Sequence, residues 1–169
     1  AVYYELEGGS FVCVRPSGTE PKLKAYYSLK CKDSQSANSL FEKVKKLYED
    51  YANSAYIQTN YYIDTPSFDL RKNGVGLRIR SFENKYVMTL KTPLSEGLLE
   101  KTENITKDEY KAMRDHNVFP ENKIKSFLIM LGFEVETLKI LTSLRTERID
   151  IAFETGIFSI DRNEYQGKV

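Results

Sequence analysis

The start of the chain contains three stretches with the composition and spacing of β-strands. Residues 3–7 and 11–15 alternate apolar and polar positions and are joined by the sequence GGS, which predicts a hairpin that turns at Gly8-Gly9. Residues 22–30 are rich in Tyr and Leu, which predicts a third strand. We therefore expect a hairpin followed by a strand, with the sequence RPSGTEPK in the loop between the second and third strands.

The spacing of apolar residues changes from Ala37 onward. Over residues 37–51 they recur at the intervals of an amphipathic helix, and Asp33 or Ser34 can serve as its N-cap. The composition shifts again in the sequence YANSA. We place a domain boundary there, which gives a first domain over residues 1–54 and a second over residues 55–169.

The second domain mixes strand-like and helix-like patterns. IQTNYYID, GLRIRSF, KYVMTLKT and GLLEKTENI read as strands, and the middle two predict a hairpin at Glu83-Asn84. TKDE has the spacing of a capping box, and NKIKSFLIMLGF predicts a further helix that ends at Gly132. ETLKILTSLRTERIDIAF reads as two strands or one long bent strand, and GIFSIDRN as the last strand.

These elements predict an α+β fold. It would be an antiparallel β-sheet or an incomplete tunnel-like β-barrel with flanking helices, preceded by a small β-hairpin, strand and helix segment.

Composition narrows the class of protein without identifying it. The chain has 169 residues, with 41% hydrophobic and 29% charged residues, as in an ordinary globular protein. A formal net charge of +1 gives no reason to expect nucleic-acid binding. Cys13 and Cys31 are the two cysteines, which fits a reducing, cytoplasmic location. Apolar runs such as FLIML are too short to span a membrane, and the first residues do not resemble a signal peptide.

The loop from Arg15 to Lys22 contains the groups that a phosphate site needs. Arg15 can form a bidentate charged pair, and Ser17 and Thr19 add hydroxyl donors. Gly18 allows backbone N–H groups to approach an anion closely. The same residue types also form ordinary turns, so chemistry alone leaves both interpretations open.

The sequence RPSGTEPKLKAYY resembles the phosphate-binding loop in the C-terminal domain of the phosphoglucomutase and phosphomannomutase family. The resemblance covers residues 1–53. It implies that Arg15, Ser17, Gly18 and Thr19 hold the non-reacting phosphate of a phosphosugar. The phosphorylated serine loop and the metal-binding aspartate cluster of such mutases have no counterpart in this sequence. Mutase activity is therefore not expected from this chain alone.

Basic residues also alternate along strands of the second domain. Arg78 and Arg80 are two residues apart in LRIR, so a strand places them on one face. Other charged residues in strand-like sequence are Lys91, Glu100, Glu103, Arg145, Arg148 and Asp161. The pattern fits a solvated sheet face. This is the interpretation that the pattern alone favours. The alternative is a barrel lined with Arg and Lys that takes a polyphosphate, with carboxylates that hold Mg²⁺ or Mn²⁺.

Residues 56–169 resemble the CYTH family, the triphosphate tunnel enzymes. The resemblance lies in QTNYYIDTPSFDLRKNGVGLRIR, KYVMTLKTP, GLLEKTE, RTERIDI and FSIDRNEYQGKV. The family fold is an antiparallel β-barrel tunnel, and its members hydrolyse inorganic or thiamine triphosphate or cyclise ATP. The phosphate-binding residues that the resemblance implies are Arg78, Arg80, Lys91, Arg145 and Arg148. It implies Glu100 and Asp161 as ligands of Mg²⁺ or Mn²⁺, with Glu103 as an alternative to Glu100.

Two parts of the CYTH pattern are absent from the sequence. The opening ExExK strand does not occur before Gln58, and the chain stops at Val169, before the closing DYELE-like strand. Open strand edges would pair with another chain, so a homo-oligomer is among the expected partners. The sequence YYELE, with Glu5 and Glu7, resembles the closing strand. Whether the first segment replaces tunnel strands or forms its own sheet stays open.

Together the two resemblances describe a composite, or chimeric, chain. The first function hypothesis is metal-dependent hydrolysis of an inorganic or organic triphosphate by the second domain. The alternative is a non-catalytic module that binds a phosphosugar through the first domain. A third possibility is an interaction protein with two inactive halves. The expected ligand is thus a triphosphate or a phosphosugar, and no nucleic-acid or membrane partner is expected.

Overall fold

The structure is a computed structural model that describes residues 2–16, 23–47, 54–154 and 156–166. The chain divides into two compact units, Ala1–Ala52 and Asn53–Val169. Each unit is described by itself below.

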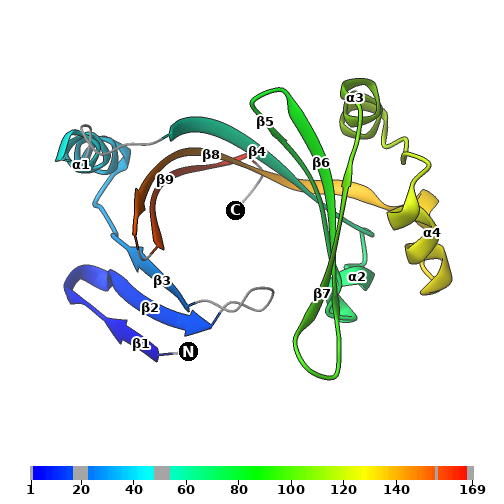
Figure 1. The fold of residues 1–169 in the computed structure, drawn as a ribbon, viewed down its shortest axis with the longest axis horizontal. Coiled ribbons are helices and arrows are strands. Elements are labelled where there is room, and N and C mark those ends of the chain that lie inside the picture. The colour runs from blue at the N-terminus through cyan, green and yellow to red at the C-terminus, as the bar shows by residue number, and fades with distance from the viewer. Residues whose placement is uncertain (1, 17–22, 48–53, 155, 167–169) are drawn as a thin grey trace. The chain divides into compact units, whose positions relative to one another are not determined.

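The first unit is a three-stranded antiparallel sheet followed by a helix (Figure 1). Its elements are β1 (Val2–Glu5), β2 (Phe11–Pro16), β3 (Leu23–Ser28) and α1 (Ser34–Leu47). The predicted hairpin is confirmed, because β1 pairs with β2 across a short 3-10 turn in which Gly8 and Gly9 have positive φ angles of 74° and 78°. The predicted helix is also present, and Asp33 Oδ1 caps it by accepting a hydrogen bond from the Ser36 N–H at 2.7 Å.

The first strand does not complete the larger sheet of the second unit. β1 pairs with β2 in the three-stranded sheet, whereas the second unit has a separate six-stranded sheet. Glu5 ends β1, and Glu7 lies in the 3-10 turn rather than on the strand. The hypothesis that YYELE replaces a strand of the tunnel is therefore wrong for the described residues.

The second unit is built on a six-stranded antiparallel sheet in the order β7-β6-β5-β4-β8-β9. Its strands are β4 (Ser54–Asp64), β5 (Gly76–Phe82), β6 (Lys85–Pro93), β7 (Leu98–Asn104), β8 (Lys139–Phe153) and β9 (Gly156–Gln166). Its helices are α2 (Asp69–Lys72), α3 (Lys107–His116) and α4 (Lys123–Met130), and Val135–Thr137 forms a 3-10 turn. The predicted α+β fold with an antiparallel sheet and flanking helices is confirmed.

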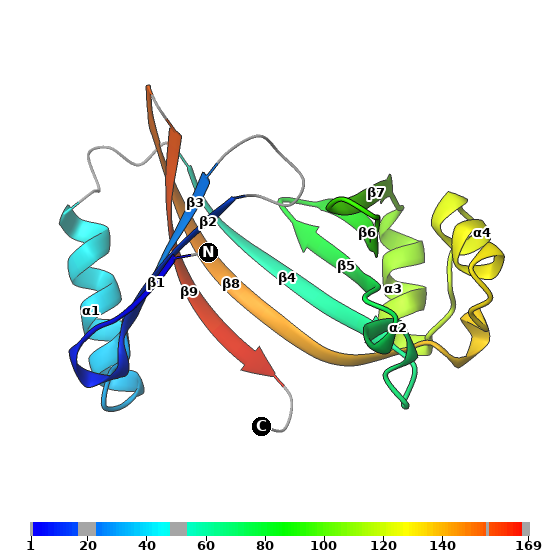
Figure 2. The same cartoon turned by 90° about the horizontal axis from the view of Figure 1, so that it is seen from below.

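The six-stranded sheet is strongly curved (Figure 1). α3 and α4 lie against the convex side of β6 and β7, and β4 and β8 pair along almost their full lengths (Figure 2). The hydrophobic core lies between the convex side and the helices. It consists of Ile63, Leu70, Val75, Leu77, Ile79, Met88, Leu90, Ile105, Tyr110, Met113, Ile124, Leu128, Val135 and Leu138. Full burial of one such side chain contributes about 1.5–3 kcal/mol, so this core is the main source of stability for the unit.

Several local predictions for the second unit are confirmed. Glu83 and Asn84 have positive φ angles of 46° and 62°, as a two-residue type I′ hairpin turn requires. Thr106 and Glu109 form the expected capping box at the start of α3. Gly132 has a φ of 85° just after α4. The segment with two interpretations is one long strand, β8.

None of the described helices is both long enough and apolar enough to cross a membrane.

The helix α2 was not predicted, and Asp64 organises it. Asp64 Oδ1 accepts hydrogen bonds from the N–H groups of Thr65 at 2.7 Å and Leu70 at 2.8 Å. Asp64 Oδ2 accepts from the N–H of Arg71 at 3.1 Å. The first N–H groups of a helix have no partner within the helix, so this carboxylate satisfies them. A helix of four residues cannot be stable by its own propensity, and α2 therefore depends on Asp64.

We predict that Asp64→Ala lowers the free energy of unfolding by about 2 kcal/mol, because buried backbone donors lose their acceptor. Urea denaturation followed by circular dichroism measures this change. Glu96→Ala is the matched control, since Glu96 is exposed in the loop between β6 and β7, and its effect should stay within about 0.5 kcal/mol. Equal effects of the two substitutions would contradict the role given to Asp64.

Candidate functional site

The antiparallel register divides the side chains of the large sheet between two faces. Leu77 and Ile79 of β5 belong to the core under the helices. Arg78 and Arg80 alternate with them, so they lie on the opposite, concave face. Cross-strand pairing extends this face to the other strands through Gln58, Asn60, Tyr62, Thr89, Lys91, Glu100, Thr146, Arg148, Asp161 and Asn163.

Arg78 and Arg80 occupy the middle of the concave face, on β5. Neither forms an ion pair with a described residue. Arg78 Nε is buried and has no hydrogen-bond partner among the described residues. Arg80 Nε donates to Asn60 Oδ1 at 2.8 Å. Leaving a buried donor such as Arg78 Nε without a partner costs about 1–3 kcal/mol, and an anion bound to the guanidinium group would offset this cost.

The basic residues nearer the two edges of the face are paired with carboxylates. Lys91 Nζ of β6 lies 3.1 Å from Glu100 Oε2 of β7. Arg148 of β8 makes a bidentate pair with Asp161 of β9, in which Nε and Nη2 each donate across 2.6 Å. The concave face therefore has two uncompensated arginines at its centre and one neutralised pair toward each edge.

Electrostatics show that the arginines act on one another. Burial lowers the pKa of Arg80, and the positive charges of Arg78 and Arg148 lower this pKa further. The hydrogen bond that Arg148 donates to Asp161 raises the pKa of Arg148. Arg80 and Arg148 remain protonated at neutral pH, because an arginine side chain loses its proton only in strongly alkaline solution. The centre of the face is thus a concentrated positive charge that an anion would relieve.

Neutral polar residues complete the concave face, and sequence reasoning missed them. Gln58, Asn60, Thr89 and Thr146 are each less than 5% exposed, although none of the described helices of the second unit covers this face (Figure 1). Thr146 Oγ1 donates to Asn163 Oδ1 at 2.7 Å. A signal for two of them is present in the sequence IQTNYY, where Gln58 and Asn60 alternate with Ile57 and Thr59. Buried polar residues at one parity of a strand indicate a polar face.

Two of the sequence candidates lie on the other face of the sheet. Arg145 pairs in register with Thr59, which places it on the face of the sheet opposite to that of Arg148. Its Nη1 donates to Glu164 Oε2 at 3.1 Å. The structure therefore does not bring Arg145 together with Arg78, Arg80, Lys91 and Arg148, and a phosphate-binding role for Arg145 stays a prediction. Glu103 also lies on the convex side, since it pairs with Met88. The choice between the two glutamates of β7 thus falls on Glu100.

The carboxylates of the concave face do not by themselves fit a divalent cation. Glu100 and Asp161 were the predicted ligands, but they lie on the two opposite edge strands, and each is paired with a basic residue. The described residues contain no group of three or more His, Cys, Asp or Glu side chains that could hold a metal ion. Hard cations such as Mg²⁺ usually need several oxygen ligands in one place. We assign no metal site to this part of the chain.

The loop of the first unit can be compared with its prediction only in part. Ser17, Gly18 and Thr19 lie outside the described residues. Arg15 stands at the end of β2, where its Nη2 donates to the hydroxyl of Tyr26 at 3.0 Å and its guanidinium lies 5.2 Å from the centre of the Tyr26 ring. Binding of a phosphosugar by this loop stays a prediction.

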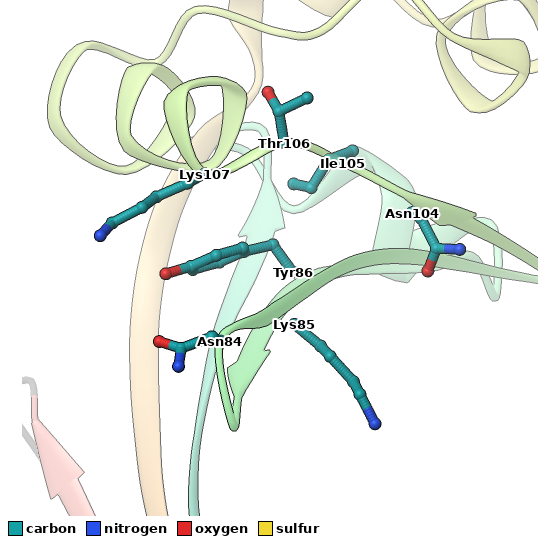
Figure 3. Close-up of a pocket in the computed structure, with 7 residues that line it drawn as sticks. All are labelled: Asn84, Lys85, Tyr86, Asn104, Ile105, Thr106 and Lys107. Atoms are coloured by element: carbon teal, nitrogen blue, oxygen red, sulfur yellow. The ribbon is translucent and has the colours of Figure 1, made fainter.

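A surface hollow lies where the β5–β6 turn meets the start of α3 (Figure 3). Figure 3 shows Tyr86 between Asn84 and Lys107, with Lys85 pointing the other way. The Tyr86 ring packs on that of Tyr110, with 4.8 Å between ring centres. None of the residues predicted to bind phosphate or metal lines this hollow. We therefore place the candidate site on the concave face instead.

Comparison with known proteins assigns the chain to a family. The model of the CYTH domain matches residues 27–169, which is most of the chain. The chain therefore belongs to the CYTH family. The resemblance predicted for residues 56–169 is confirmed, and it extends further toward the start of the chain than expected.

Individual relatives support this assignment. "Putative triphosphatase YjbK" of Bacillus subtilis (strain 168) is 35% identical over 111 residues, which are 66% of this chain and 57% of that protein. The alignment thus spans less than two thirds of that relative. The crystal structure of a "putative adenylate cyclase" from Bacillus halodurans has a TM-score of 0.66 and 31% identity, over 77% of this chain and 70% of that one.

A more distant structure shares the fold. It is that of "Putative adenylyl cyclase HpAC1" from Hippeastrum, a protein described as having a dominant triphosphatase activity. Its TM-score is 0.61 with 22% identity, over 75% of this chain and 68% of that one.

No comparison supports a phosphoglucomutase segment. The CYTH match begins at residue 27 and includes α1, which sequence analysis had assigned to the mutase-like part. The description of the chain as a composite of two families is unsupported for residues 27–53. Short motifs of Pro, Ser, Gly and Thr recur in turns of many proteins, so the motif alone does not establish a mutase segment.

We predict that Arg78→Met raises the free energy of unfolding by roughly 1 kcal/mol in a buffer without multivalent anions. Methionine keeps the apolar stem and removes both the unpaired donor and a repulsive charge. Urea denaturation measures the change. Lys91→Met serves as the comparison, because it breaks the pair with Glu100 and should not stabilise the protein. A loss of stability in Arg78→Met would show that Arg78 is satisfied in the free protein.

Proposed function

We propose that this chain binds a triphosphate on its concave face, and that the protein hydrolyses an inorganic or organic triphosphate. The observation that carries the proposal is the buried, unpartnered Nε of Arg78 beside Arg80, in a face without a neutralising carboxylate at its described centre. Membership in the CYTH family and the similarity to a protein named as a triphosphatase support it.

The four basic residues of the concave face have two roles in this proposal. Arg78 and Arg80 bind phosphate oxygens directly, since their guanidinium groups match an oxyanion in shape and charge. Lys91 and Arg148 exchange their carboxylates, Glu100 and Asp161, for further phosphate oxygens. A triphosphate is longer than a single phosphate and has more oxygens, so it can engage more of these groups at once.

Hydrolysis would follow from binding and charge stabilisation. A water oxygen forms a bond to the terminal phosphorus while the bond from that phosphorus to the bridging oxygen breaks, which gives phosphate and diphosphate. Positive side chains placed around the transferred group stabilise the negative charge on its oxygens. The expectation that Glu100 and Asp161 hold Mg²⁺ or Mn²⁺ stays a prediction of the sequence, and we assign no step to it.

We predict that the protein releases phosphate from inorganic triphosphate in the presence of Mg²⁺ or Mn²⁺. Arg78→Ala and Arg80→Ala should each lower kcat/KM at least about 100-fold, since each removes a charged contact to the phosphate chain. A colorimetric phosphate assay with and without each metal measures the rates.

Arg145→Ala is the matched control for these variants. It removes the same side chain from the opposite face of the same sheet and should leave kcat/KM within about twofold, because its partly exposed pair with Glu164 contributes little to stability. Release no faster than in a blank of metal and substrate alone would refute the proposed hydrolysis. Equal losses in Arg145→Ala and Arg78→Ala would refute the assignment to the concave face.

A further inference from the structure

Two arginines of the concave face are held through the same atom by different partners. Arg148 Nε donates to the carboxylate of Asp161 at 2.6 Å. Arg80 Nε donates to the amide oxygen of Asn60 at 2.8 Å. Asp161 also accepts from Arg148 Nη2 at 2.6 Å, so it neutralises the guanidinium group and occupies one of its terminal nitrogens. Asn60 accepts from Nε alone and leaves the charge of Arg80 in place.

Asn60 is placed for this contact by the register of the sheet. It lies directly opposite Arg80 in the β4–β5 pair and is only 2% exposed. A buried amide must be hydrogen-bonded to avoid a large desolvation cost. Asn60 Oδ1 meets this need by accepting the hydrogen bond from Arg80 Nε. The Asn60 side chain is therefore held in one orientation.

We propose that Asn60 is a positioning residue for the binding of triphosphate, an inference that rests on the function proposed above. It fixes Arg80 through Nε, so that the two terminal nitrogens of the guanidinium remain available to phosphate oxygens. As a neutral acceptor it also leaves the full positive charge in place beside Arg78. An aspartate at this position would hold Arg80 equally well but would cancel the charge that attracts the ligand.

A purely structural role for Asn60 makes different predictions. If the amide only satisfied polar groups inside the sheet, its replacement would change stability without a specific effect on anion affinity. If it acts through Arg80, its replacement changes affinity only while Arg80 is present. Binding and the state of the Arg80 side chain therefore have to be measured separately.

The test uses the full chain and inorganic triphosphate as the probe. Isothermal titration calorimetry gives the affinity, and ¹⁵N-resolved NMR follows the Nε–Hε group of Arg80, which is identified by its loss in Arg80→Lys. We expect slow hydrogen exchange of this group in the wild type and fast exchange in Asn60→Leu, which has a similar size but no acceptor. Affinity in Asn60→Leu should fall about tenfold, as for the loss of one positioned charged contact.

The Asn60→Asp variant keeps an acceptor for Arg80 Nε but adds a negative charge, so it tests the position of Arg80 and its charge separately. Its Arg80 Nε–Hε signal should stay protected while the affinity for triphosphate falls at least about tenfold. Asn163→Asp is the matched control, because it adds the same charge to the same face on the edge strand β9. It should weaken binding no more than about threefold, since the added charge is farther from Arg80 and screened by solvent. Equal losses in the two aspartate variants would overturn the proposal.

A double-mutant cycle completes the test. Asn60→Leu should weaken binding much less in an Arg80→Gln background than in the wild type, because its effect runs through Arg80. An equal loss in both backgrounds would overturn the positioning role. Failure of the wild type to bind triphosphate, with Arg80 Nε–Hε still protected by Asn60, would instead refute the proposed function and the inference that rests on it. If Asn60→Leu does not fold, Asn60→Asp and its control decide the matter.

Discussion

The alternation of side chains along β5, held in register by its neighbours, is the constraint on which the rest of the second unit depends. Leu77 and Ile79 are buried in the core, and Arg78 and Arg80 must then lie on the concave face. A slip of one residue would bury both arginines against the helices and expose the core residues, at a cost of many kcal/mol. Burial of apolar side chains on one face therefore fixes the position of the charges on the other. The basic face needs no ligand to hold it in place, so it is preorganised for an anion.

Positive charges held close together lower the stability of the free protein unless carboxylates pair with them. The pattern of ion pairs shows which of the basic residues lack such a partner. Toward the edges of the sheet, Glu100 and Asp161 compensate Lys91 and Arg148. At the centre, Arg78 and Arg80 have no carboxylate partner among the described residues, and the pKa of Arg80 is lowered by burial and by its basic neighbours. An unpaired buried charge without a function is a loss of stability that selection has no reason to retain. Natural proteins commonly give up stability in this way at the site where they bind a ligand.

Much of the fold could be predicted because its signals are local. The turn at Glu83-Asn84 and the capping box at Thr106 are each specified by neighbouring residues. α2 was missed because its stability comes from the side chain of Asp64, several residues earlier, and not from a helical pattern. The grouping of Arg145 with Arg148 in the sequence analysis has a different source. In LRTERID, Arg145 and Arg148 are three residues apart, and an odd separation on a strand without a bulge places two side chains on opposite faces. The alternation that identified Arg78 and Arg80 would have excluded Arg145. Asn60 was not identified from the sequence because predictions of phosphate sites look for charged residues. Asn60 is uncharged, and in the proposed role it matters because it does not neutralise Arg80.

The ion pairs Lys91–Glu100 and Arg148–Asp161 also affect which lengths of anion the concave face could bind. A short anion at the centre meets Arg78 and Arg80 without displacing any protein group. A longer one reaches Lys91 or Arg148 only if its oxygens replace the carboxylate of Glu100 or Asp161. Each such exchange substitutes one charge-assisted hydrogen bond for another, so its net free energy is small compared with the gain at the centre. The released carboxylate then becomes an unpaired acceptor close to the bound anion. The net gain from a longer anion therefore depends on how well water screens the charge of this carboxylate from the phosphate chain.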